Sequence, residues 1–291
     1  MFRVFIGYEP RQAEAYMVCK ESVRRHAGTR AVVQGVLLSD LIRRGWYLRP
    51  TNRRFGALID ELSIREGYNG ELSTEHANAR FFVPYLARSR QGWAIFMDND
   101  TMVRSDMDEL FQLLAKSRDK ALMCVHHDHR PLYGASAKQP YLTKMDNQVQ
   151  TSYERKNWSS VMAFNLEHPA NDRLTPEMLN TVPGRELHRF CWLHDDEIGE
   201  LSVEWNWLVR VNNQAFYPDR EIKPKIVHWT LGGPWLPAFS ADPFSEEWFD
   251  LRDQCVLGER KPQTRDELVQ RLREKMIEPP PEMARPAWLG A

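Results

Sequence analysis

The sequence predicts an α/β protein with a mostly parallel sheet, and two observations carry that prediction. The first is the order of elements at the N-terminus, where an apolar strand over 2–6 is followed by a turn, a helical pattern to about residue 26 and a second strand over 31–38. A strand, a helix and a strand in that order favour parallel pairing through a right-handed crossover. The second is the apolar strand 93–97, which runs directly into two acidic residues. Ligands of α/β proteins bind at such carboxyl ends of sheet strands.

The segment between these strands is expected to hold one loop-rich excursion and one helix. Residues 43–69 are polar, basic and interrupted by Gly and Pro, which is typical of loops rather than core. Ser73 or Thr74 then caps a helix rich in aromatic residues, and Pro84 is expected to bend it. This helix leads the chain into the strand 93–97.

Strands and helices continue to alternate beyond the acidic residues. A helical pattern covers 106–114, and a further strand covers 121–125. Residues 130–157 show little periodicity and predict a loop over the substrate face of the sheet. Two more strands are expected at 160–165 and 225–229.

The C-terminal residues form a separate segment. Thr264 and Glu267 have the spacing of a capping box, which predicts a helix that ends before the prolines at 279–281. No internal repeat is visible in the sequence. We therefore expect one large domain over 1–255, followed by a helical and then proline-rich tail over 256–291.

The composition is that of a globular protein without a strong overall charge. The chain has 291 residues, of which 42% are hydrophobic, and this is enough for a substantial core. The 39 basic residues nearly balance the 40 acidic ones, so no global field recruits nucleic acid or an anionic membrane. We therefore expect no nucleic-acid partner.

The spacing of the cysteines and the length of the apolar runs indicate the cellular compartment of the protein. The four cysteines are far apart and show no C-x-x-C spacing, which argues against a zinc ribbon, a redox pair or a disulfide framework. Residues 1–7 lack the features of a signal peptide, and no apolar run approaches bilayer length. We expect a cytoplasmic protein with no integral membrane segment.

Asp98 and Asp100 follow the strand 93–97 with one residue between them. Alternate residues of an extended backbone face the same way, so both carboxylates would point together and Asn99 would point away. Two such charges repel each other unless a cation lies between them. Mg²⁺ or Mn²⁺ would neutralise the pair and keep positions open for substrate phosphates. A solvated acidic turn would use the same residues, so both interpretations stay open here.

Seven short segments stand in a characteristic order along residues 2–250. They are Gly7-Tyr8, Ala79-Arg80-Phe81, Asp98-Asn99-Asp100, residues 158–165, Asp195-Asp196-Glu197, Glu204-Trp205-Asn206 and residues 227–235. Their order resembles that of family 8 glycosyltransferases, the glycogenin-like retaining enzymes with the GT-A fold. The resemblance implies a GT-A-like nucleotide-diphospho-sugar transferase fold for the catalytic domain 1–255, with a mixed, mostly parallel central sheet flanked by helices.

The resemblance also implies a metal site. Asp98 and Asp100 would hold a divalent ion, usually Mn²⁺, that bridges the diphosphate of a UDP-sugar, and His228 would be the third protein ligand. Imidazole suits Mn²⁺ better than Mg²⁺, and a neutral His adds a ligand without adding negative charge. The alternative for a lone His beside two tryptophans is a hydrogen-bonded core residue.

Five residues would contact the nucleotide or the donor sugar. Gly232 and Gly233, in the loop after the histidine, could offer backbone N–H groups to phosphate oxygens. Arg80 corresponds to a family arginine near the donor, and its alternative is a surface helix residue. Tyr8 lies where the family holds its uracil, although it could equally cap the core. Asn99 is also assigned to the nucleotide.

Two segments depart from the family pattern. The family has an Asp-Gln pair where Asp195 and Asp196 stand, and its aspartate binds hydroxyls of the donor sugar. We assign both residues to the catalytic site and leave their individual roles open, with a solvated acidic turn as the alternative. Gly233 stands where the family usually has a lysine, so stabilisation of the leaving group would rest on the metal, on backbone N–H groups or on a cation such as Arg80.

The leading hypothesis is a metal-dependent retaining glycosyltransferase that moves a hexose from a UDP-sugar to an unidentified glycan, lipid or protein acceptor. Two alternatives remain. In a haloacid dehalogenase-type phosphatase, Asp98 would attack phosphorus and Asp100 would act as acid and base. That motif normally opens its domain, however, and it usually has Thr or Val where Met102 stands. The third interpretation is a non-catalytic carbohydrate-binding protein built on a transferase fold.

Overall fold

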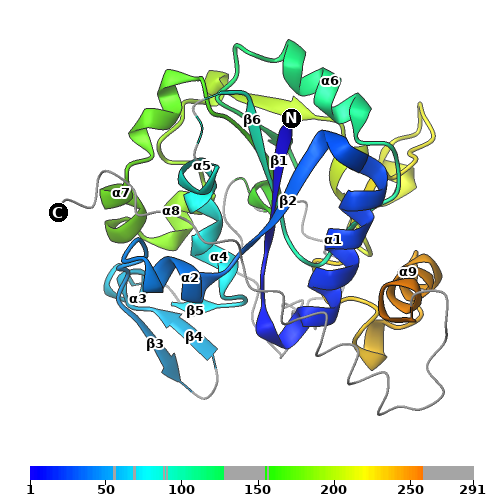
Figure 1. Cartoon of the computed structure of the whole chain (residues 1–291), viewed down its shortest axis with the longest axis horizontal. Helices are drawn as coiled ribbons and strands as arrows, with labels where there is room; N and C mark the ends of the chain where they lie inside the picture. The colour runs from blue at the N-terminus through cyan, green and yellow to red at the C-terminus, as the bar shows by residue number, and fades with distance from the viewer. Residues whose placement is uncertain are drawn as a thin grey trace.

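The computed structural model describes residues 1–54, 57–67, 70–87, 89, 91–127, 155 and 157–257. These residues form an α/β fold built around a six-stranded sheet (Figure 1). In order across the sheet, the strands are β10 (Ile198–Leu201), β8 (Leu122–Val125), β9 (Val161–Asn165), β6 (Trp93–Met97), β1 (Phe2–Gly7) and β2 (Ala31–Val36).

The sheet is mixed and mostly parallel, as the sequence predicted. β1 pairs in parallel with β2 and with β6, and β10 pairs in parallel with β8. Only β9 runs the other way, because it is antiparallel to both β6 and β8. All residues of β6 and β9 are buried, which is the pattern of strands covered on both faces.

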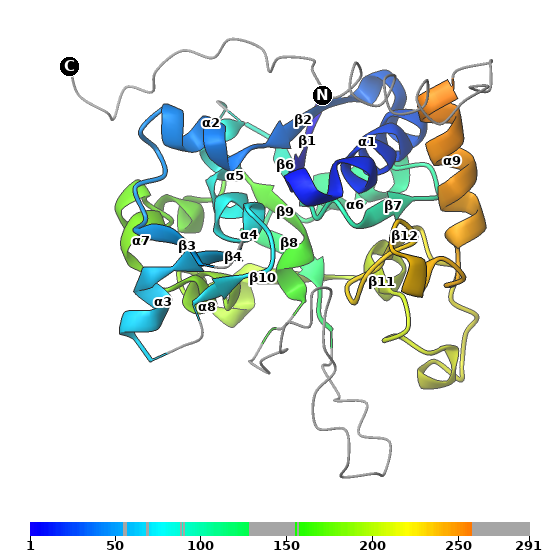
Figure 2. The same ribbon diagram turned by 90° about the horizontal axis from the view of Figure 1, so that it is seen from below.

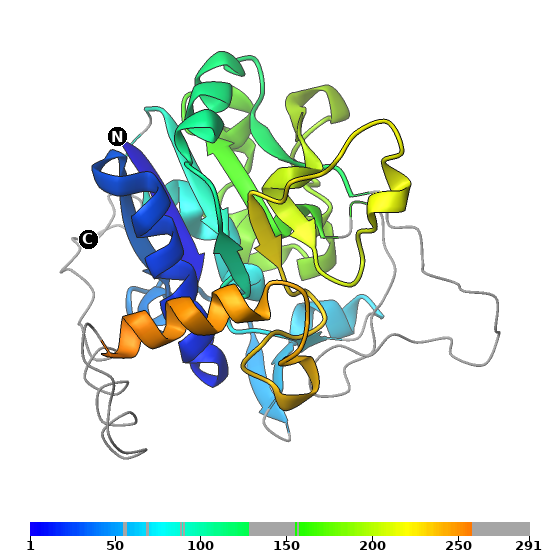
Figure 3. The ribbon, with the colours of Figure 1, turned by 90° about the vertical axis from the view of Figure 1, so that its right-hand side faces the viewer.

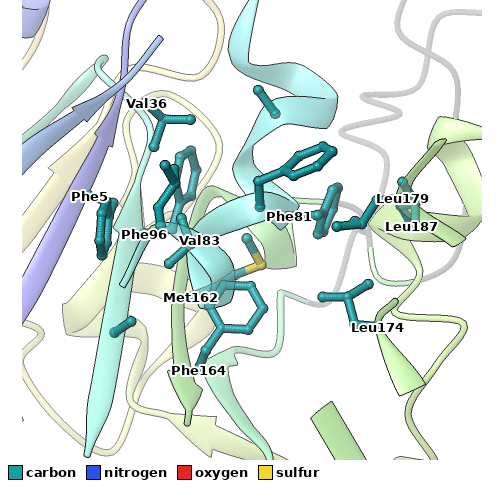
Figure 4. Packing of buried hydrophobic residues seen from close by; sticks show 14 of the residues in the cluster. Phe5, Val36, Phe81, Val83, Phe96, Met162, Phe164, Leu174, Leu179 and Leu187 are labelled. Carbon is teal, nitrogen blue, oxygen red and sulfur yellow. The ribbon is translucent and has the colours of Figure 1, made fainter. Parts of the chain in front are cut away.

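Helices cover both faces of the central sheet. The helices are α1 (Ala13–Ala27), α2 (Leu38–Arg43), α3 (Glu61–Arg65), α4 (His76–Ala79), α5 (Val83–Leu86), α6 (Asp108–Lys116), α7 (Pro176–Thr181), α8 (Gly184–His188) and α9 (Ser245–Leu257). Alternate strand residues divide between two cores, since Phe5 and Phe96 pack with α5, α7 and α8 while Ile6 and Ile95 pack with α1 and α6. Figure 4 shows part of the first core, to which Phe5, Phe96 and Phe81 all belong.

The bend expected at Pro84 is present. The segment forms α4, then the short 3₁₀ helix η3 (Arg80–Phe82), then α5, with Pro84 in the first turn of α5. The predicted cap is wrong, because the helix begins at His76 after Glu75 and no side chain caps it. Glu75 is tied down instead, since its backbone N–H donates to the Glu9 carboxylate at 2.8 Å.

Two small sheets flank the central one (Figure 2). The first contains β3 (Thr51–Arg54), β4 (Ala57–Asp60) and β5 (Glu71–Leu72), so the loop-rich excursion expected at 43–69 is wrong in part. Residues 52–54 of β3 are exposed and polar, and such a strand shows no hydrophobic alternation in the sequence. The buried ion pair Arg49–Asp60, with 2.7 Å between nitrogen and oxygen, anchors this sheet.

The second small sheet carries the chain back to the acidic residues. It contains β11 (Trp207–Leu208), β12 (Ile226–His228) and β7 (Thr101–Val103), with β12 antiparallel to β7. Helix α9 crosses α1 beside it (Figure 3) and buries Trp248 against Val18. The predicted helix after Thr264 and nearly all of the loop 130–157 lie outside the described residues. In the described part of the chain, no helix has both the length and the apolarity that a membrane crossing requires.

Candidate active site

Two separate elements bring Asp98, Asp100 and His228 together. The aspartates follow β6, and His228 is the last residue of β12, which pairs opposite Thr101 of β7. The backbone N–H of Trp229 donates to the carbonyl of Asp100 at 3.0 Å and closes this junction. One ligand atom from each of the three side chains lies within 4.8 Å of the others. The juxtaposition predicted from the sequence is therefore present.

Asp98 is held by two basic side chains. Arg80 approaches both carboxylate oxygens, with Nη2 at 2.8 Å from Oδ1 and Nη1 at 3.2 Å from Oδ2. His76 Nε2 lies 3.1 Å from Oδ1. Burial alone would raise the pKa of Asp98, but the Arg80 guanidinium and the hydrogen bond from His76 outweigh it and hold that pKa well below its usual range. Asp98 is therefore a carboxylate at neutral pH.

Arg80 is a buried residue rather than a surface helix arginine. Its Nη1 donates to the carbonyl of Ser159 at 2.8 Å, and its Nε donates to the carbonyl of Ala77 at 2.9 Å. The guanidinium carbon also lies 4.9 Å from the ring centroid of Phe96. These contacts fix the planar fork of donors against Asp98.

His76 is a site residue that the sequence analysis missed. It precedes Arg80 by four residues, and that spacing puts both side chains on one helix face. The ring packs against Gly7, where an added Cβ would lie 2.3 Å from the imidazole. Glycine at position 7 therefore leaves the space in which His76 reaches Asp98.

His228 and Asp100 face each other. His228 Nε2 lies 3.2 Å from Asp100 Oδ1, and both side chains are largely buried. The other ring nitrogen, Nδ1, lies 3.1 Å from Oδ1 of Asn206. Asp100 Oδ1 is buried, and within the described ranges it forms no hydrogen bond of good geometry. A cation between these groups would satisfy that oxygen.

The donor atoms fit a divalent ion. Two carboxylates and one imidazole nitrogen form a set that Mn²⁺ accepts well and that Mg²⁺ accepts through its oxygens. Across the described ranges, these three residues are the one group of His, Cys, Asp and Glu side chains close enough to share a metal ion. The site therefore suits the ion implied by the sequence.

Asn99 and Asp100 form a turn rather than the extended backbone expected from the sequence, and the Asn99 side chain does not face a ligand site. It is buried, and its Nδ2 donates to Oε1 of Gln12 at 3.0 Å. Its amide joins the acidic turn to the segment before α1. The assignment of the Asn99 side chain to the nucleotide is therefore corrected to an internal anchor.

Tyr8 lies at the same end of the sheet as Asp98, because β1 and β6 are parallel neighbours. The ring is half-buried and packs edge-on against Tyr16, with 5.1 Å between centroids. Burial raises the pKa of its hydroxyl, and the nearby Glu75 and Glu9 raise it further. Tyr8 thus packs on α1 and also stands beside the acidic end of the sheet.

Gly232 and Gly233 are buried, and their surroundings explain why both are glycine. Gly232 has a φ of +139°, and an added Cβ would lie 2.6 Å from Phe239. A Cβ at Gly233 would lie 2.1 Å from the Trp235 ring. The N–H of Gly232 donates to the carbonyl of Trp229 at 2.9 Å. The prediction that this N–H is available to a phosphate is therefore corrected, since the turn uses it.

Asp195 and Asp196 are not at the site. They precede β10. β10 is parallel to β8, and β8 and β6 are both antiparallel to β9, so β10 runs in the same direction as β6. Their place at the amino end of β10 is opposite the carboxyl end of β6. Both are exposed, and Asp195 forms an ion pair with Arg155. Their assignment to the catalytic site is corrected to a surface turn, the alternative that the sequence had left open.

The comparisons with known proteins agree with this architecture. No protein-family model matches the chain. Protein CDI of Arabidopsis thaliana is 39% identical over 255 residues, which are 87% of this chain and 86% of that protein. The WbbM bifunctional glycosyltransferase is 17% identical with a TM-score of 0.52, and the apo form of the glycosyltransferase GlyE from Streptococcus pneumoniae TIGR4 is 16% identical with a TM-score of 0.50.

The two structural matches include most of this chain and only part of each neighbour. They cover 93% and 96% of this chain, but 51% of the WbbM chain and 64% of the GlyE chain. At these identities the likeness concerns the fold. The chain therefore has a GT-A glycosyltransferase fold and belongs to the same family as Protein CDI of Arabidopsis thaliana.

Proposed function

We propose that the protein is a metal-dependent glycosyltransferase that moves a hexose from a UDP-sugar to a glycan, lipid or protein acceptor with retention at the anomeric carbon. The observation that carries the proposal is the group Asp98, Asp100 and His228, within 4.8 Å of one another at the carboxyl end of β6 in a GT-A fold. That end of an α/β sheet is where ligands bind. The retention and the UDP-sugar donor in this proposal come from the resemblance of the sequence to family 8 glycosyltransferases.

The charges of the site favour a diphosphate once a cation is bound. Asp98, Asp100 and Arg80 together carry one net negative charge. A divalent ion held by Asp98, Asp100 and His228 reverses that sign and supplies Lewis-acid stabilisation to a departing diphosphate. The protein groups are already oriented before the reaction, so they need little rearrangement when negative charge develops.

Arg80 acts on this site mainly by holding Asp98. All three of its nitrogen atoms donate to Asp98 or to the carbonyls of Ala77 and Ser159. These contacts use the Nε–H, both Nη1 N–H groups and one of the two Nη2 N–H groups, so the positive charge acts on the diphosphate mainly through space. This arrangement supports a positioning role for Arg80 and leaves most of the leaving-group charge to the cation.

The position of Asp195 and Asp196 supports a mechanism in which neither attacks the sugar. Both stand at the amino end of β10, at the opposite end of the sheet from Asp98. Retention would then follow from attack by the acceptor on the face of the donor from which UDP departs. No covalent intermediate with either residue is part of the proposal.

The position of Asp98 along the chain favours transfer over phosphatase chemistry. The nucleophilic aspartate of a haloacid dehalogenase-type phosphatase normally opens its domain, whereas the complete unit β1, α1 and β2 precedes Asp98 here. The phosphatase hypothesis therefore has less support than the transferase hypothesis.

Release of UDP from UDP-sugars tests the proposal. The purified protein is incubated with UDP-glucose or UDP-galactose, with Mn²⁺ or with a chelator. We expect slow UDP release that requires Mn²⁺, because water replaces the acceptor poorly. Asp100→Asn should reduce the rate at least tenfold, since it removes a charged ligand. Asp195→Asn is the matched control and should retain the wild-type rate.

Three results would contradict the proposal in different ways. Equal UDP release by wild type and Asp100→Asn would show that the group Asp98, Asp100 and His228 takes no part in the reaction. Phosphate release from phosphomonoesters, with no nucleotide sugar consumed, would favour the phosphatase. Mn²⁺-dependent binding of UDP-sugars without any release, in the presence of candidate acceptors, would favour the non-catalytic carbohydrate-binding protein.

A further inference from the structure

A chain of hydrogen bonds connects His228 to the start of β9. His228 Nδ1 lies 3.1 Å from Asn206 Oδ1, and Asn206 Nδ2 donates to the Ser160 hydroxyl at 2.8 Å. The Ser160 hydroxyl in turn donates to the backbone carbonyl of Asn157 at 2.7 Å. Asn206 is fully buried, and Ser160 and His228 are nearly so. Water therefore does not compete for these partners.

The last member of the chain sets the direction of every hydrogen bond before it. A backbone carbonyl can only accept, so the Ser160 hydroxyl must give its single proton to Asn157. That hydroxyl can then only accept from Asn206, which must present its NH₂ group to Ser160. The amide oxygen of Asn206 is left facing the ring of His228. An oxygen acceptor requires that His228 carry a proton on Nδ1.

We propose that Asn206 is a positioning residue that fixes the tautomer of His228, with the proton on Nδ1 and the lone pair of Nε2 directed at the cation. The proposal rests on the metal site of the proposed function. In this tautomer the Nε2 lone pair faces Asp100 Oδ1 at 3.2 Å, so two acceptors face each other. While the ring is neutral, a cation placed between them satisfies that pair.

The opposite tautomer would close the site. With the proton on Nε2, His228 would donate to Asp100 and occupy both the ring nitrogen and the oxygen that a metal ion needs. Asn206 prevents this, because its oxygen would then face a bare Nδ1 lone pair. Such partners of a metal-bound histidine typically change metal affinity by about 10–100-fold.

Ser160 also holds the backbone of the acidic turn at Asp98. Its backbone carbonyl accepts from the N–H of Asp98 at 2.8 Å, while its hydroxyl holds Asn206. One residue immediately before β9 thus supports the acidic turn and the histidine together. Loss of the hydroxyl would free the Asn206 amide to rotate by half a turn and present its NH₂ to His228.

Nitrogen NMR of the metal-free protein tests the tautomer directly. Long-range proton–nitrogen spectra of the imidazoles are recorded with a chelator and with the His228 ring neutral, and His228→Gln identifies the signals of that ring. We expect a protonated Nδ1 in the wild type and in Asn206→Asp, which keeps an acceptor oxygen. Asn206→Leu should move the proton toward Nε2. A bare Nδ1 in the wild type, or an unchanged tautomer in Asn206→Leu, would overturn the proposal.

Binding of Mn²⁺ alone provides the second measurement. Asn206→Leu should weaken Mn²⁺ affinity by about 10–100-fold, and Asn206→Asp should restore most of it. Asn165→Leu is the matched control, since Asn165 is also buried with three hydrogen bonds but lies at the far end of β9. Its Mn²⁺ affinity should equal that of the wild type. Equal affinities in Asn206→Leu and Asn165→Leu would overturn the proposal.

The NMR measurement and the Mn²⁺-binding measurement together distinguish failure of this proposal from failure of the proposed function. If the wild type shows the Nδ1–H tautomer but binds no Mn²⁺, the metal site fails and the tautomer assignment stands. If the wild type binds Mn²⁺ and Asp100→Asn does not, while Asn206→Leu binds normally, the metal site stands and the role of Asn206 fails. Ser160→Ala replaces Asn206→Leu if that variant does not fold, and it should shift the tautomer in the same direction.

Discussion

Asp98 shows how single residues set the charge of the site. It is a largely buried carboxylate beside a second carboxylate, and Arg80 and His76 keep it ionised. The sequence predicted Asp98, Asp100 and His228 because the motif and the segment order mark them. It did not predict His76 or the hydrogen-bond role of Asn206, because those roles depend on contacts between residues 22 positions apart in each case.

Arg80→Met should destabilise the protein by about 3–5 kcal/mol at neutral pH, because it leaves a buried carboxylate without its ionic partner. Denaturant unfolding measures the loss. Arg30→Met is the control, since Arg30 pairs with Asp106 on the surface and such pairs contribute about 1 kcal/mol or less. Similar losses in the two variants would contradict the account of Asp98.

The cost of Arg80→Met should also depend on pH. The pKa of Asp98 is depressed in the folded wild type, so the stability from its ionised form is present above the ordinary carboxyl pKa, about 4, and is lost as pH falls. A protonated Asp98 no longer needs Arg80. The difference in stability between the two proteins should therefore shrink below about pH 4. A constant difference across that range would contradict the assignment.

At the scale of elements, two junctions build the site. The helical segment from α4 to α5 carries His76 and Arg80 onto the end of β6, and the pairing of β12 with β7 carries His228 there. The strand predicted at 225–229 and the bend at Pro84 were read correctly from apolar runs and proline. The small sheet at 51–72 was missed, because its exposed edge strand has no hydrophobic alternation.

Gly7→Ala tests the first of these junctions. Its new Cβ would lie 2.3 Å from the His76 ring, so the ring must move away from Asp98. We expect a loss of about 1–3 kcal/mol in stability, as for other overpacked cores, together with weaker Mn²⁺ binding. Gly35→Ala in the adjacent strand is the control, because its Cβ meets side-chain ends of Leu37 and Tyr16 at 2.8 Å. Mn²⁺ affinity should change only in Gly7→Ala, and an equal change in both would refute the junction.

At the scale of the whole molecule, the order of strands decides which residues meet. The fold class and the mostly parallel sheet follow from the alternation of strands and helices, and the structure confirms them. The place of Asp195 and Asp196 does not follow from that pattern. It depends on β10 joining β8 at the edge of the sheet, three positions from β6, and no local signal in the sequence encodes that position.

The most direct test of the account is a crystal of the protein soaked with Mn²⁺ and UDP, with anomalous scattering used to locate the metal. We expect one strong manganese peak within bonding distance of carboxylate oxygens of Asp98 and Asp100 and of Nε2 of His228, with diphosphate oxygens completing its coordination. Asp195 and Asp196 should have no part in it. A manganese peak elsewhere, or bound UDP with no metal beside Asp98 and Asp100, would contradict the account.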